Sequence, residues 1–133
     1  MAVRHLAQRG FTIVARNHRT PVGEFELSDN AYGTFDLYYQ QHGRAYLLDA
    51  VNPKIVSSVH YDVQFDNAYW DPDLKQVVYG DQSYFYPYVS LNFANADDVV
   101  AHELTHGVTQ FESNLFYAYQ SGAISESLSD IWG

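Results

Sequence analysis

The pentapeptide His102-Glu103-Leu104-Thr105-His106 constrains this chain more than any other feature of its sequence. Two histidines four positions apart lie on one face of a helix, so both imidazoles can reach a single metal ion. Glu103 is rotated away from that face, and its carboxylate can reach a metal-activated water without binding the metal itself. The pentapeptide therefore predicts a helix that carries two metal ligands and a candidate general base.

Two acidic residues follow at a spacing that suits a third ligand. Nineteen residues separate His106 from Glu126, and Asp130 lies four positions further along a second predicted helix. Glu126 would complete a site of two histidines and one carboxylate, leaving open the fourth tetrahedral position that a catalytic zinc needs. Asp130 can accept a hydrogen bond from the free nitrogen of a ligand histidine and fix the orientation of its ring. This arrangement predicts a zinc hydrolase.

Length and composition favour one folded domain and disfavour several kinds of partner. Of the 133 residues, 47% are hydrophobic, which is sufficient for a core. The formal net charge of −9 argues against a nucleic-acid partner, because basic side chains are what neutralise phosphates. No apolar run is long enough to span a membrane. The absence of cysteine excludes disulfides and thiolate metal sites.

The apolar patterns predict an α+β fold, in which an antiparallel β unit over 54–88 packs with the active-site helix. Alternation, β-branched residues and intervening turn residues indicate the strands. These are expected at 11–16, 24–27, 54–65, 67–70, 76–79 and 83–88.

Three helices are expected from apolar spacing and capping residues. The first runs over 29–42, with Ser28 as N-cap and Gly43 as C-cap. Its aromatic stripe is better explained by core packing than by ligand binding. The second has Asn95 or Asp97 as its cap and continues to about Asn114, where asparagine tolerates the left-handed conformation that often closes a helix. The third runs over 123–132.

The segment from Asp98 to Gly133 resembles the active-site region of the thermolysin family of metalloproteases. The spacing between His106 and Glu126 fits that family, and two upstream segments match it in the same order. These segments are Ser57–Tyr61 (SSVHY) and Asn67–Trp70 (NAYW). The resemblance is strong from about residue 55 and weaker over 29–43. It implies that residues 1–133 form a single domain, the zinc-binding N-terminal lobe of such a protease.

The resemblance also implies a role for each residue of the metal site. His102, His106 and Glu126 would be the zinc ligands, and Asp130 would be the hydrogen-bond partner of His102. Glu103 would act as the general base that takes a proton from the zinc-activated water and returns it to the leaving amine.

Further residues match family positions that contact substrate or calcium. Tyr117 would hydrogen-bond the developing oxyanion. Asn67 and Ala68 would belong to an edge strand that pairs with the backbone of a peptide or protein substrate. Val99 would line an apolar pocket for the residue that follows the scissile bond. Asp98 matches one calcium ligand, although most calcium ligands of the family are expected to be absent.

The resemblance covers one lobe of a two-lobed cleft. The last predicted helix stops at Gly133, so we expect the chain to be truncated at its C-terminal end and the helical second lobe to be absent. The face of 123–132 that this lobe would cover is then expected to favour self-association or another partner. Ser125 and Gln110 stand where we expect asparagine and aspartate in relatives. The resemblance implies a secreted protein, although no signal peptide is found in this sequence.

Three functions remain open at this point. The chain can be a zinc metalloendopeptidase, or a zinc-binding lobe that lacks competent catalysis because the second lobe is missing. In the third alternative, the histidines are structural and the chain is a small acidic globular protein.

Overall fold

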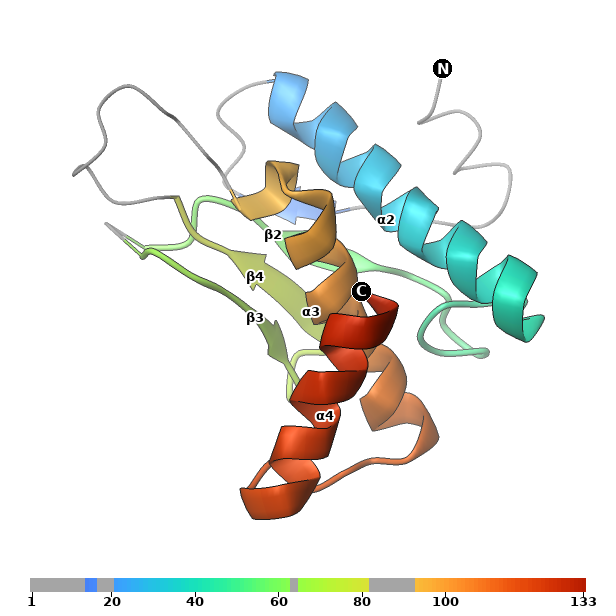
Figure 1. Ribbon diagram of the computed structural model, residues 1–133. Helices are drawn as coiled ribbons and strands as arrows, with labels where there is room; N and C mark the ends of the chain where they lie inside the picture. The colour runs from blue at the N-terminus through green and yellow to red at the C-terminus, as the bar shows by residue number, and fades with distance from the viewer. Residues whose placement is uncertain (1–13, 17–20, 63–64, 82–92) are drawn as a thin grey trace.

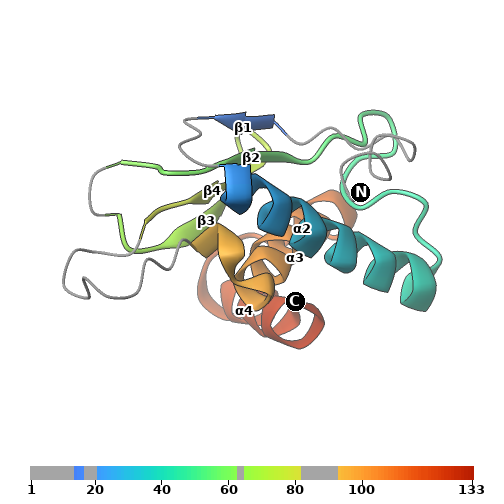
Figure 2. The same ribbon diagram turned by 90° about the horizontal axis from the view of Figure 1, so that it is seen from above.

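The computed structural model describes residues 14–16, 21–62, 65–81 and 93–133. Within these ranges a small sheet lies beside three α-helices, as Figures 1 and 2 show. The expected α+β class is confirmed. None of the described helices is long and apolar enough to cross a membrane.

The sheet has four described strands in the spatial order β1-β2-β4-β3. They are β1 (Val14–Arg16), β2 (Val56–Ser58), β3 (Ala68–Asp71) and β4 (Gln76–Tyr79). The hairpin of β3 and β4 is antiparallel as expected, but β2 runs parallel to both β1 and β4. The expectation of an antiparallel unit is therefore wrong at β2. After β2 the chain forms β3 at the edge of the sheet and then returns as β4 between β2 and β3. Strand β4 therefore runs in the same direction as β2.

The strand expected over 54–65 is much shorter in the structure. β2 ends at Ser58, and His60 and Asp62 follow it with φ angles of 56° and 57°. Left-handed residues turn the chain out of an extended path, so they end the strand. The expected strand at 83–88 and the first part of that at 11–16 lie outside the described residues.

Helix α2 (Pro21–His42) begins eight residues before the expected position. The strand expected at 24–27 and the cap expected at Ser28 are both wrong, because these residues lie within the helix. A four-residue alternation is too short to exclude a helix, and Pro21 has the φ angle that a first helical turn requires. Its buried side chains recur at helical spacing: Leu27, Ala31, Phe35 and Tyr38. Gly43 closes the helix as expected, with a φ of 66°.

Helix α3 (Asp97–Glu112) carries the histidine pentapeptide and is the central helix of the fold. It contacts β3 and β4, and it also contacts α2 and the C-terminal helix. Val100, Leu104 and Val108 are buried at intervals of four residues. This spacing fixes one face of α3 in the core and directs the neighbouring face, with both histidines, toward the C-terminal helix.

The ends of α3 differ partly from expectation. Its N-cap is Ala96, which follows the short 3-10 helix η1 (Phe93–Asn95), and it makes no side-chain capping bond. Asp97 and Asp98 instead lie in the first turn, where negative charge complements the helix dipole. Asn114 adopts the expected left-handed conformation, with a φ of 46°.

Helix α4 (Tyr119–Trp132) begins four residues before the expected position and packs on α3. Its buried residues are Gly122, Ser125 and Ser129, which form one stripe of small side chains. Small residues let two helices approach closely. The opposite face leaves Ile124 and Ile131 exposed.

Replacing Gly80 with alanine is expected to destabilise the β3–β4 hairpin. A Cβ atom at this position would overlap the backbone carbonyl of Phe65. The backbone of Gly80 cannot move freely, because its N–H donates to the carbonyl of Asn67 at 2.9 Å. Overpacking of this kind costs about 1–3 kcal/mol or more. The midpoint of urea unfolding should fall. Gly33→Ala should not lower it, since a Cβ at Gly33 would meet no atom of the described part of the chain within 4 Å. Equal midpoints for Gly80→Ala and the wild type would contradict this.

Candidate metal centre

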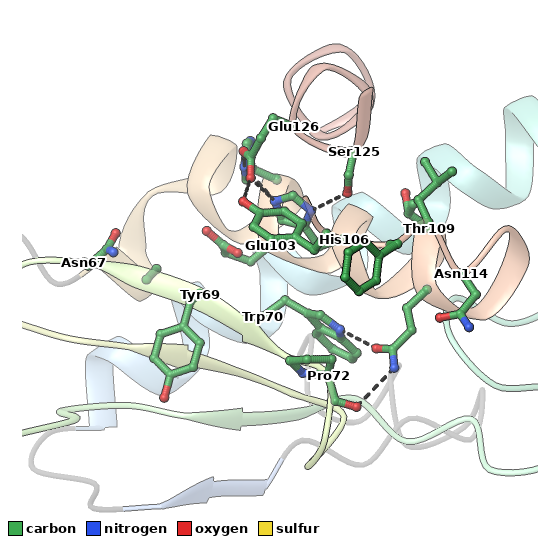
Figure 3. Close-up of a pocket in the computed structure, with 16 residues that line it drawn as sticks. Asn67, Tyr69, Trp70, Pro72, Glu103, His106, Thr109, Asn114, Ser125 and Glu126 are labelled. Carbon is green, nitrogen blue, oxygen red and sulfur yellow. Dashed lines mark hydrogen bonds and ion pairs between the residues drawn. The ribbon is translucent and has the colours of Figure 1, made fainter. Parts of the chain in front are cut away.

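His106 of α3 lies beside Glu126 of α4 (Figure 3), and His102 of α3 joins them. One nitrogen or oxygen atom from each of His102, His106 and Glu126 lies within 4.8 Å of the others. The Nε2 atoms of the two histidines are 3.1 Å apart. Glu126 Oε2 is 3.3 Å from Nε2 of His102, and its Oε1 is 3.5 Å from Nε2 of His106.

These separations fit a tetrahedral metal ion. Two ligand atoms at ~2.0–2.1 Å from zinc, subtending a tetrahedral angle, lie roughly 3.3 Å from one another. The distance between the two Nε2 atoms and the shortest distance from Glu126 to each histidine are close to that value, the two Glu126 distances being to different oxygens of its carboxylate. Imidazole nitrogens and a carboxylate oxygen are also the donor atoms that zinc takes in hydrolytic sites. The donor set and its spacing therefore fit zinc.

Each histidine is also held through its other ring nitrogen. His102 Nδ1 lies 3.0 Å from Asp130 Oδ1, the residue that the family resemblance implied as its partner. His106 Nδ1 lies 3.1 Å from the hydroxyl oxygen of Ser125, a partner that sequence reasoning did not assign. The available signal was the position of Ser125 next to Glu126, which turns its side chain toward α3.

His102, His106 and Glu126 are called the metal group below. Glu103 lies beside this group but is not one of its members. It is largely buried, and this burial raises the pKa of its carboxyl above the usual range. The charge of His102 and a hydrogen bond from the backbone N–H of Trp70 lower the pKa, while Glu126 raises it further. A carboxyl group with a raised pKa is suited to exchange a proton with a reacting molecule.

Burial also affects the second histidine of the group. Loss of solvent lowers the pKa of the His106 imidazole, although Glu126 acts in the opposite direction. A lowered pKa favours the neutral ring, which is the form that binds a metal ion.

A cavity of about 760 Å³ opens in front of these groups. It lies between β3, α3 and the segment that joins α3 to α4 (Figure 3). His102, Glu103, His106 and Glu126 line it together with residues from three other places in the chain. The latter include Asn67, Ala68, Tyr69 and Trp70 of the β3 region, Gln110 and Asn114 near the end of α3, and Phe116 and Tyr117 before α4.

The remaining predicted residues have different positions. Val99 and Asp98 do not line this cavity; they line an adjoining one of about 470 Å³, which shares Asn67, Ala68 and the His102–Glu103 pair with the first. Tyr117 is 66% exposed, and its hydroxyl donates a hydrogen bond to Glu126 Oε1. The structure thus brings Tyr117 to the metal group, while Val99 lines the adjoining cavity.

Strand β3 presents a backbone edge to the cavity. It is the last strand in the sheet order, so its outer edge has no strand neighbour among the described residues. Gln110 fixes the strand to α3, because it accepts a hydrogen bond from Trp70 Nε1 at 2.7 Å and donates one to the carbonyl of Pro72 at 3.1 Å. An exposed edge next to a cavity can pair with an extended peptide.

Comparison with known proteins gives consistent similarities. The family model of the thermolysin metallopeptidase catalytic domain matches residues 25–110. Neutral protease NprE of Bacillus pumilus is 46% identical over 101 residues, covering 74% of this chain and 31% of that protein. Bacillolysin of Bacillus subtilis (strain 168) is 46% identical over 101 residues, covering 74% of this chain and 18% of that protein.

One solved structure is similar over most of the fold. The precursor of protealysin, a metalloproteinase from Serratia proteamaculans, aligns with a TM-score of 0.74 and 31% identity. The alignment covers 92% of this chain and 41% of that one. The chain therefore spans less than a third of the length of the curated relatives named above and less than half of this structural neighbour.

Proposed function

Since the chain belongs to the thermolysin family of metallopeptidases, we propose that it forms the zinc-binding side of a peptidase cleft, in which zinc-activated water hydrolyses peptide bonds. The observation that carries this proposal is the convergence of His102, His106 and Glu126, with Glu103 beside them on the cavity wall. When bound, zinc supplies a Lewis acid that polarises a carbonyl oxygen and makes water a stronger nucleophile at neutral pH.

Glu103 is the proposed general base. Its carboxylate would take a proton from the attacking water as the water oxygen forms the new C–O bond to the carbonyl carbon. It would later deliver that proton to the nitrogen of the leaving amine as the peptide C–N bond breaks. Its burial and its hydrogen bond to the Trp70 backbone support this role, because they hold the carboxylate at the cavity wall. The Tyr117 hydroxyl, next to Glu126, is the proposed donor to the developing oxyanion.

The proposed substrate is an extended peptide or protein segment bound along β3. Asn67 and Ala68 would pair with its backbone, and Val99 would contact the apolar residue after the scissile bond. The outer position of β3 in the sheet and the lining of the two cavities support this assignment. By the same family resemblance, we propose that the protein acts outside the cell.

A zinc-binding lobe without competent catalysis is the second candidate. For residues 1–133 taken by themselves, this candidate is favoured by the small share of the relatives that they span, because any transition-state donor outside these residues would have to be supplied separately. Loss of one oxyanion donor typically reduces the rate by ~10²–10³-fold.

The exposed face of α4 supports a related proposal on partners. Ile124 is 52% exposed and Ile131 is 68% exposed on this helix. We propose that this apolar face associates with a second copy of the chain. Sedimentation as a monomer at high protein concentration would contradict self-association.

Zinc content and peptide cleavage together separate these candidates. The purified chain is loaded with zinc and incubated with a peptide library that contains apolar residues. Cleavage that a chelator stops and added zinc restores would support the peptidase. One bound zinc per chain with no cleavage of any peptide would select the zinc-binding lobe. A chain that binds no zinc would contradict both.

A further inference from the structure

The two histidines of the metal group are supported by side chains of very different character. Asp130, the partner of His102, is a carboxylate whose side chain is 71% exposed. Ser125, the partner of His106, is a neutral hydroxyl that is 4% exposed. Water can replace an exposed partner, but it cannot easily reach a buried one. The orientation of His106 should therefore depend more strictly on its protein partner.

We propose that Ser125 is the positioning residue of His106 for zinc binding, an inference that rests on the proposed function. Nε2 of His106 faces His102 and Glu126, so this nitrogen is the one that would bind the metal. In a neutral imidazole bound through Nε2, the hydrogen is on Nδ1. Nδ1 then donates to the Ser125 hydroxyl oxygen, which fixes both the tautomer and the plane of the ring.

The packing of α4 explains why a serine can fill this role. Ser125 belongs to the buried stripe of Gly122, Ser125 and Ser129 on α4, the helix that packs on α3. A hydroxyl on this stripe lies inside the helix contact, within reach of a ring on the facing helix. Glu126, the next residue, is rotated toward the cavity. Helix α4 therefore supplies a metal ligand and the hydrogen-bond partners of both histidines.

Ser129 offers a matched control on the same stripe. It is also buried, but its hydroxyl has no hydrogen-bond partner among the described residues and lies outside the metal group. Replacing either serine with alanine removes one buried hydroxyl from the same helix contact. Alanine also favours helix formation, so both variants should fold, which circular dichroism can verify.

Zinc affinity, measured by competition with a chelator, is the first readout. Ser125→Ala should bind zinc ~10–100-fold more weakly than the wild type, the usual effect of losing a hydrogen-bond partner of a ligand histidine. Ser129→Ala should bind zinc as the wild type does. Equal zinc affinity in the wild type and Ser125→Ala would overturn the inference and leave the proposed function intact. A wild-type chain that binds no zinc would contradict the proposed function itself.

The second readout is the rate at which the Nδ1–H proton of His106 exchanges with solvent. A general loss of stability would not change this rate at His106 alone. In the NMR spectrum of the zinc-loaded wild type this proton should exchange slowly with solvent. In Ser125→Ala it should exchange faster, while the corresponding proton of His102 keeps its wild-type rate because Asp130 is unchanged. Equal exchange rates for His106 in the two proteins would also overturn the inference.

Discussion

Glu103→Gln is expected to lower peptide hydrolysis by ~10²–10⁴-fold, the usual contribution of a positioned general base. The amide has nearly the same shape as the carboxylate, so it can occupy the same place on the cavity wall, but it cannot take a proton from water. Glu103 is not among the three residues whose atoms converge for metal binding, so zinc affinity should stay close to the wild-type value. The measurement is the initial rate of cleavage of one library peptide at saturating zinc, together with the zinc content of each protein.

Glu112→Gln is the matched control for this substitution. Glu112 is also a glutamate of α3, but it pairs with Arg44 at the other end of the helix and is outside the metal group. Its substitution removes the same charge from the same helix and should leave cleavage unchanged. Undiminished cleavage by Glu103→Gln would exclude Glu103 as the base, and with it the mechanism proposed for this family member.

The convergence of His102, His106 and Glu126 is the part of the structure that the sequence predicts best. A spacing of four residues places His102 and His106 on one helical face whatever the helix packs against. The four-residue spacing of Glu126 and Asp130 likewise places both on one face of α4, whereas the pairing of Asp130 with His102 in particular was implied by the family resemblance. Local periodicity is a property of one helix, so it can be deduced without knowledge of the tertiary structure.

The features that sequence reasoning missed depend on contacts between distant segments. The parallel pairing of β2 with β4 follows from the order in which the chain occupies the sheet, and no local pattern encodes that order. The beginning of α2 was mistaken for a strand because four alternating residues fit either structure. The contact of Ser125 with His106 depends on how closely α4 approaches α3. In each case, the missing information is the position of a partner in space.

Zinc binding is expected to raise the melting temperature of the wild type substantially. A ligand at 1,000 times its dissociation constant stabilises the folded state by about 4 kcal/mol. For a domain of this size, that corresponds to roughly 10–20 °C in Tm. In Glu126→Gln this zinc-dependent increase should disappear, because the amide keeps the shape of the side chain but is a poor zinc ligand. Differential scanning calorimetry with and without zinc measures the increase in each protein.

The quantity to compare between the wild type and Glu126→Gln is the zinc-dependent increase in Tm, not the Tm of each protein without metal. Glu126 is half-exposed, and its carboxylate lies within ion-pair distance of both histidines. Its substitution can therefore change the stability of the metal-free protein as well. Glu112→Gln removes an equivalent charge outside the metal group, and it should keep the full zinc-dependent increase. If Glu126→Gln kept the same increase as the wild type, the carboxylate would not be a ligand. Zinc would then be held by the two histidines without the third protein donor that a catalytic site of this class requires.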